Sequence, residues 1–314
     1  MISLDDKSIF EQYYQASYDF NTSSLSEKDI DSIKILVREK RVNYALAPIG
    51  QHIFAFISEQ CPNIKFELVE LDSHKIDGML YIPKSGYDKA YIIINKSKPL
   101  INQIFAAAHE YYHYINDYEA IKEKPYVCCL SSLKDISEKK ASRFAAEILL
   151  PEGALQKELK AFKNKYNCQE NKQLGFVEYA YLSMELTIKY QIPLKSVIYR
   201  FHEEGYIKNI NKFIENYSVI KHVLLQIELF KEQIDLLYDN ENNAVFNSGL
   251  IYQQIEMAYA EGLASRDEII NDATSLGLNI EIIHSFFDQF EEDDEAESDL
   301  EALTIIKNKW GGKL

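Results

Sequence analysis

Leu100-Ile-Asn-Gln-Ile-Phe-Ala-Ala-Ala-His-Glu-Tyr-Tyr-His-Tyr-Ile-Asn-Asp117 is the stretch of sequence that decides the fold. Its apolar residues recur at helical spacing and no proline or glycine interrupts it, so it predicts a buried helix. His109 and His113 are four residues apart and therefore share one face of that helix. Glu110 lies one step round. Two such imidazoles can bind one metal ion, and the carboxylate can take a proton from a water molecule that the ion activates, so the pattern predicts a metal-dependent peptidase.

A third metal ligand is needed, because catalytic zinc sites usually have three protein ligands and one open position. The segment from Ser137 to Pro151 predicts the next helix, with Ser137 as its N-cap and the proline at its end. Glu138 and Glu147 are the two candidates, and nine positions separate them by about half a turn, so both cannot face one metal. We choose Glu138, which lies beside the apolar stripe. The alternative is that Glu138 is only a first-turn carboxylate favoured by the helix dipole.

Residues 105–113 and 138–151 resemble the ImmA/IrrE family of metallopeptidases. That family carries an F-T-x-A-H-E-x-G-H helix followed by E-x-x-A-N-x-F-A-x-x-L-L-M-P. Residues 45–56 are similar to the helix before the family's small sheet, and residues 186–207 are similar to its closing segment. The resemblance implies a Zn²⁺ cofactor, and it implies these site residues: metal ligands His109, His113 and Glu138, with Glu110 as the catalytic base.

Two positions depart from the family pattern. Tyr112 stands where the family usually has glycine, so a large ring must find room beside the metal helix. Ser142 stands where the family usually has asparagine, four residues after the expected third ligand. A serine is shorter than an asparagine and is expected to hold a ligand less directly.

The composition limits the classes of partner and the compartment. The formal net charge of −15 at pH 7 argues against a sequence-independent hold on nucleic-acid phosphates. The acidic start of the chain does not look like a signal peptide, and no apolar run reaches membrane-spanning length, so we expect a cytoplasmic protein. Cys128 and Cys129 are adjacent and lack a C-x-x-C spacing, so we expect buried free thiols.

The pattern along the chain predicts an α+β fold that is predominantly α. Residues 65–71, 78–83 and 90–95 read as strands, and the last has the continuous apolar run of a central strand. The resemblance places this sheet beside the metal helix, where an edge strand can pair with an extended substrate. We interpret the regions as follows: 1–43 an N-terminal helical extension, 44–212 a metallopeptidase-like domain, and 213–314 a helical C-terminal region with an acidic tail.

The first functional hypothesis is a zinc-dependent endopeptidase. By resemblance, its substrate is a helix-turn-helix transcriptional repressor in a bacterial stress response or a mobile element. The C-terminal region is expected to recognise a protein partner or to control access to the site. No contact with nucleic acid or membrane is expected.

Two other hypotheses belong to different classes. A peptidase-fold regulator with weak or no proteolysis could sequester a partner in a toxin–antitoxin or phage-defence setting. A DNA-binding regulator could use residues 192–205 as a helix-turn-helix, although only Lys195 and Arg200 supply fixed cations there. His202 follows Arg200 in a segment that could close over the site, but no residue is assigned as the oxyanion donor.

Overall fold

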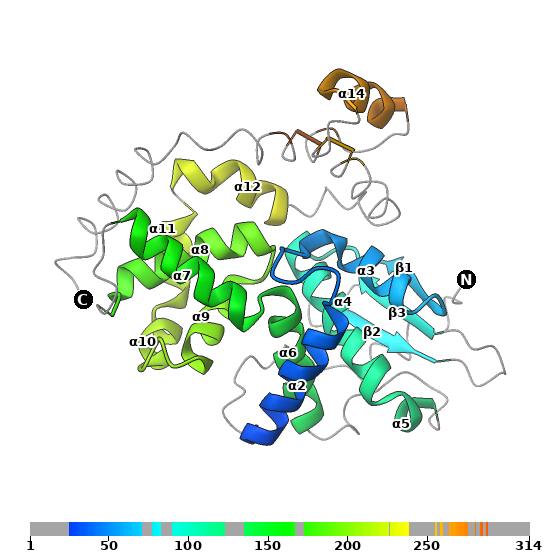
Figure 1. The fold of residues 1–314 in the computed structure, drawn as a ribbon, viewed down its shortest axis with the longest axis horizontal. Coiled ribbons are helices and arrows are strands. Elements are labelled where there is room, and N and C mark those ends of the chain that lie inside the picture. The colour runs from blue at the N-terminus through cyan, green and yellow to red at the C-terminus, as the bar shows by residue number, and fades with distance from the viewer. Residues whose placement is uncertain are drawn as a thin grey trace.

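A computed structural model describes residues 25–70, 77–82, 90–122, 135–166, 173–225, 227–238 and 264–275, together with residues 255, 258, 259, 280, 283, 284 and 287. The first 24 residues, Cys128, Cys129 and the acidic stretch after Phe287 lie outside this description. Helices surround one small sheet, which confirms an α+β fold that is predominantly helical (Figure 1).

The sheet has three described strands in the order β1-β3-β2: β1 is Ile64–Val69, β2 is Gly78–Tyr81 and β3 is Ala90–Asn95. β1 runs parallel to β3, and β2 pairs with β3 in the antiparallel direction. The central place of β3 was predicted from its unbroken apolar run. A strand covered on both faces has no polar side to alternate with, and Ile92, Ile93 and Ile94 are all buried.

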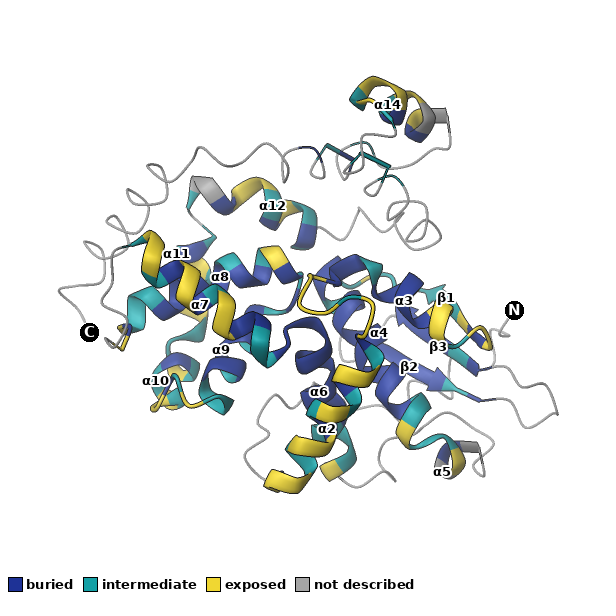
Figure 2. Cartoon of the chain, in the orientation of Figure 1, coloured by how far each residue is buried: buried dark blue, intermediate teal, exposed yellow. Residues whose placement is uncertain are grey.

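Helix α4 (Leu100–Asn116) packs against β2 and β3, and apart from Asn102 it is buried from its first residue to His113 (Figure 2). The 3₁₀ turn Gly50–His52 and helix α3 (Ile53–Gln60) cover another side of α4. Gly78 allows the close approach of β2 to α4, because a Cβ at this position would lie 3.0 Å from the Cβ of Ala106. The backbone of the edge strand therefore lies directly against the metal-site helix.

Helix α6 (Asp135–Leu149) packs along α4, and α2 (Glu27–Lys40) packs along α6 (Figure 1). Ser26 caps α2, because its hydroxyl accepts from the amide of Asp29 and the Asp29 carboxylate accepts from the Ser26 amide. The expectation that Ser137 caps the next helix is wrong: α6 begins two residues earlier, so Ser137 lies inside its first turn. Its hydroxyl is directed instead toward the end of α4, where it donates to Asp117.

The remaining described helices are α5 (Tyr118–Lys122), α7 (Glu152–Lys165), α8 (Phe176–Tyr190), α9 (Leu194–Glu203), α10 (Ile210–Glu215), α11 (Tyr217–Leu224), α12 (Glu228–Tyr238) and α14 (Arg266–Ser275). The main hydrophobic core includes Ile33 from α2, Leu224 from α11 and Phe230 from α12. The main core therefore includes residues from before and after the predicted region boundaries at 43 and 212. Ile269 and Phe287 belong to a second, smaller cluster.

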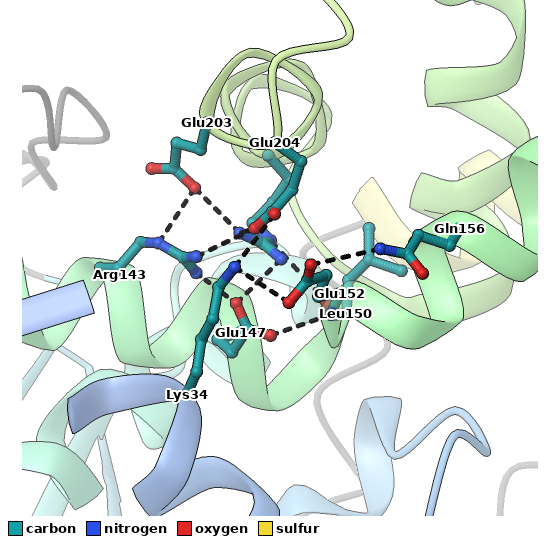
Figure 3. Close-up of polar contacts among 9 residues, drawn as sticks. Lys34, Arg143, Glu147, Leu150, Glu152, Gln156, Glu203 and Glu204 are labelled. Carbon is teal, nitrogen blue, oxygen red and sulfur yellow. Dashed lines mark hydrogen bonds and ion pairs between the residues drawn. The ribbon is translucent and has the colours of Figure 1, made fainter. Parts of the chain in front are cut away.

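A buried network of charges holds the far end of α6 (Figure 3). Arg143 and Glu147 on α6 meet Arg200 on α9, and all three side chains are at most 3% exposed. The other members lie on three helices or their ends: Lys34, Glu152, Glu203 and Glu204. Among the described residues, no helix is long and apolar enough to cross a membrane.

Candidate metal centre

His109, His113 and Glu138 converge at the interface of α4 and α6. The two Nε2 atoms of the histidines lie 3.2 Å apart. Glu138 places Oε2 at 3.2 Å from Nε2 of His109 and Oε1 at 3.2 Å from Nε2 of His113. Both imidazoles are buried, whereas the Glu138 side chain is 19% exposed. Of the two candidate carboxylates on α6, Glu138 meets the histidines and Glu147 does not.

These three groups fit a divalent metal ion. Around a tetrahedral zinc ion with bonds of about 2.0 Å, neighbouring ligand atoms are about 3.3 Å apart, close to the separations found here. Two imidazoles and one carboxylate are also the ligand set of a class of catalytic zinc sites. His109, His113 and Glu138 could therefore hold the ion through three ligand atoms and leave a fourth position for water or substrate.

The electrostatics of the site also favour a cation. Burial opposes protonation of His113, but its contacts with Asp117 and Glu138 outweigh burial and raise its pKa to about 10. Burial disfavours the charge on Glu138, yet the two histidines lower the pKa of its carboxyl to about 2. A site that holds a proton this strongly on an imidazole attracts positive charge, and a metal ion would take the place of that proton.

Glu110 is the buried carboxylate nearest to the two histidines in sequence. Neither of its oxygens has a hydrogen-bond partner of ordinary geometry among the described residues. Burial raises the pKa of this carboxyl, while His109 and His113 oppose the rise and the backbone amide of Leu80 on β2 weakly favours the ionised form. Buried polar groups normally have hydrogen-bond partners. The Glu110 carboxylate can therefore accept a hydrogen bond from a water molecule or a substrate at this place.

Asp117 is a site residue that the sequence analysis missed. Its Oδ2 accepts from His113 Nδ1 at 2.7 Å and from the Ser137 hydroxyl at 2.7 Å. The signal that could have found it is the spacing, because Asp117 follows His113 by four residues and residues four apart meet on a helix. Metal-binding histidines commonly donate their second ring N–H to a carboxylate in this way.

The two departures from the family pattern are accommodated differently. The ring of Tyr112 is buried between α4 and α6, with its centre 5.4 Å from that of Phe144, so it fills the helix interface. The hydroxyl of Ser142 lies 3.4 Å from Nδ1 of His109, beyond the usual length of a hydrogen bond. Ser142 therefore gives His109 less support than Asp117 gives His113.

Three residues considered from the sequence lie elsewhere. Glu147 faces Arg143 and Arg200, and these cations lower the pKa of its buried carboxyl to about 2. His202 donates from Nδ1 to the carbonyl of Ile207 at 2.7 Å, which gives it a structural contact. Arg200 is fully buried, so it does not supply an exposed cation to the helix-turn-helix that was considered for residues 192–205.

The fold and the site define a class of protein: a helical α+β domain with an H-E-x-x-H helix and, from the next long helix, a carboxylate that could be the third ligand of a metal ion. Residues 59–202 match the family model for the IrrE N-terminal-like domain, Peptidase_M78, so this part of the chain is similar to that family. The family supports a peptidase function of the metal-dependent type. A search of curated proteins found no match.

Proposed function

We propose that this chain is a zinc-dependent endopeptidase whose substrate is a protein, with a helix-turn-helix repressor as the expected target. The observation that carries the proposal is the convergence of His109, His113 and Glu138 beside the unpaired Glu110. The family match supports the peptidase class, and the choice of a repressor rests on the family resemblance alone. Cleavage of such a repressor would release the genes that it holds silent.

The proposed chemistry divides the work between the ion and the chain. A divalent ion in this site supplies Lewis-acid activation of water and of the scissile carbonyl. Glu110 takes the proton from the attacking water and passes it to the amine that leaves. His109, His113 and Glu138 hold the ion through three ligand atoms, so the protein leaves one position open to the reaction.

The sheet supplies a way to hold an extended peptide. β2 is an edge of the described sheet, and Leu80 on this strand is the residue whose amide lies near Glu110. An extended substrate that pairs with the free side of β2 would run past the site, with its backbone hydrogen-bonded and its side chains on alternate faces. This arrangement favours an endopeptidase, because edge pairing does not require a chain end.

The test uses the whole chain, purified without chelator and supplied with zinc. We expect one zinc ion per chain by elemental analysis, and we expect none to be retained by H113A. E110Q should retain zinc and lose all cleavage, because an amide cannot take a proton from water. Each form is expressed with the neighbouring genes of its host, and shortened proteins are found by mass spectrometry. A wild type that retains no zinc, or fragments that persist with E110Q, would refute the proposal.

The second candidate is a partner-binding regulator that keeps the fold without proteolysis. The observation in its favour is the complete burial of Glu110 and His113, since a peptidase must bring substrate to these groups. This candidate predicts that wild type and E110Q both bind zinc, retain the same partner and leave it intact. Recovery of an uncut partner with both forms would favour the regulator over the peptidase.

A further inference from the structure

The two ligand-bearing helices are joined by one carboxylate. Asp117 follows the last residue of α4, where its backbone N–H donates to the carbonyl of His113. Its Oδ2 accepts from the His113 ring, and the same oxygen accepts from Ser137 in the first turn of α6. Ser137 immediately precedes Glu138 in the chain. The Asp117 side chain therefore contacts both a histidine of the site and the residue that precedes the proposed third ligand.

The contact with His113 also fixes which ring nitrogen carries hydrogen. An ionised carboxylate can only accept hydrogen bonds, so the hydrogen in this contact belongs to Nδ1 of His113. In the neutral ring the lone pair then lies on Nε2, the atom that faces His109 and Glu138. A neutral imidazole with its lone pair so directed is the form that a metal ion binds.

We propose that Asp117 is the positioning residue of the metal centre: it fixes the tautomer and orientation of His113 and ties that histidine to the turn that presents Glu138. This inference rests on the proposed metal site and adds a residue to which no metal contact is assigned. In a third contact, the Asn116 side chain donates to Oδ1 of Asp117 at 2.8 Å. Removal of Asp117 would disturb two ligands at once, whereas removal of Ser137 would disturb only the approach of Glu138.

The test compares three variants of the full chain. D117N keeps the side-chain volume, removes the charge and replaces an acceptor oxygen by a donor. S137A removes only the tie between the helices. E119Q is the charge-matched control, because Glu119 is exposed and no described contact joins it to the site. Zinc affinity is measured by competition with a chromophoric chelator, and the visible spectrum of the Co²⁺-loaded protein reports the ligand geometry.

We expect zinc affinity to fall about 10- to 100-fold in D117N, to fall about 3- to 10-fold in S137A, and to stay within about twofold in E119Q. The Co²⁺ spectrum should change in D117N and stay that of the wild type in E119Q. Far-UV circular dichroism and the Tm of the metal-free chains accompany each measurement. A merely structural role would lower Tm and leave the Co²⁺ spectrum of the folded protein unchanged.

Each outcome decides between the proposals. A wild type that binds neither zinc nor Co²⁺ overturns the metal site and the positioning role together. A wild type that binds metal, with D117N equal to it in affinity and spectrum, overturns the positioning role and leaves the proposed function standing. S137A with unchanged affinity overturns the tie to α6. D117N that stays unfolded even with zinc overturns positioning in favour of a structural role.

Discussion

Glu138 and Glu147 stand on one helix, and the structure gives them opposite surroundings. Glu138 meets two imidazoles at 3.2 Å, whereas Glu147 meets the guanidinium groups of Arg143 and Arg200. Half a turn separates the two faces, so one helix carries the proposed ligand toward α4 and a structural anion toward α9. The same residue type thus has two roles that are set by the angle round the helix.

Substitution of the two glutamates should therefore affect different properties: zinc binding for Glu138 and stability for Glu147. We expect E138A to weaken zinc binding greatly while the metal-free protein keeps most of its stability, since a partly exposed carboxylate is lost. E147A should lower the free energy of unfolding by about 3 kcal/mol, because Arg143 and Arg200 lose a buried partner while Glu203 and Glu204 remain. Chelator competition and urea unfolding measure the two effects. The assignment of Glu138 would be wrong if E147A alone lost the metal.

Glu185 on α8 gives a prediction about pH. Burial raises the pKa of its carboxyl from 4.5 to about 7, while Lys165, with Nζ 3.8 Å away, and Lys189 lower it and Glu158 raises it. A folded-state pKa above the unfolded one means that the fold prefers the protonated acid. This stability is full below about pH 4.5 and is lost as the pH rises through 7.

The neutral glutamine should remove this dependence. Between pH 5 and pH 8, we expect the free energy of unfolding of E185Q to rise by about 1–2 kcal/mol relative to the wild type, an amount reduced for partial exposure. Urea unfolding at the two pH values is the measurement. E215Q, which changes an exposed carboxylate on α10, is the control and should track the wild type. Parallel curves for E185Q and the wild type would contradict the prediction.

At the scale of elements, the contact between β2 and α4 places the edge strand beside the site. Gly78 is the residue that allows it, because its hydrogen faces Ala106. Ala106 lies four residues before Glu110, so both face the same way on α4. A larger side chain at position 78 would therefore push on the face of the helix that carries the proposed base.

We expect G78V to lower the free energy of unfolding by about 1–3 kcal/mol through overpacking of this contact. G78A should lower it less, because a single Cβ meets Ala106 at 3.0 Å and the tip of Ile94 at 3.2 Å, and small shifts can relieve both. Thermal melts of the two variants give the order. Equal stability of G78V and the wild type would mean that β2 moves freely away from α4.

How far the elements could be predicted depends on the range of the contacts that fix them. The spacing of His109, Glu110 and His113 and the apolar run of β3 are local patterns, and the structure has the helix and the central strand where these patterns put them. The start of α6 was predicted at Glu138 and lies at Asp135, because a serine that looks like a cap donates instead to Asp117 at the end of α4. Residues 213–314 were expected as a helical region, and the structure has α11 and α12 there as separate helices. The helical pattern did not show where one helix ends and the next begins.

The partners of Glu147 could not be predicted, because Arg200 lies 53 residues further along the chain and only the packing of α9 on α6 brings it near. Helix geometry showed that Glu138 and Glu147 cannot both face one metal, but it could not name the role of Glu147. Asp117 combines a contact that the local sequence indicates with one that it does not. Its spacing from His113 is visible in the sequence, but its contact with Ser137 needs the fold.

At the scale of the whole molecule, the helices that follow residue 212 complete the main core. Ile220, Leu224, Phe230 and Ile234 are buried in it, and α12 contacts α4, the helix of the site. A chain cut before Tyr217 should therefore be much less stable than the full chain, since each of these side chains contributes roughly 1.5–3 kcal/mol of burial. Because of this packing, we expect removal of the helices after residue 216 to affect the metal site.

A cut after Tyr238 is the matched comparison. It removes the second cluster around Ile269 and Phe287 and leaves the main core whole. We expect residues 1–238 to fold and to bind zinc as the full chain does, and residues 1–216 to lose solubility or zinc. Expression, thermal melts and elemental analysis of both pieces give the answer. If the shorter piece folds and binds zinc normally, the helices after residue 216 are an accessory to the peptidase domain.

The charge network of Figure 3 also restricts which segment can pack against α6. Arg143 and Arg200 contact three carboxylates, and Lys34 on α2 brings a third cation through its contacts with Glu152 and Glu204. Any segment that displaced α2 from α6 without bringing a cation would deprive Glu152 and Glu204 of the contact that Lys34 makes with both. Another helix in the place of α2 would therefore need a suitably placed cation as well as a matching apolar face.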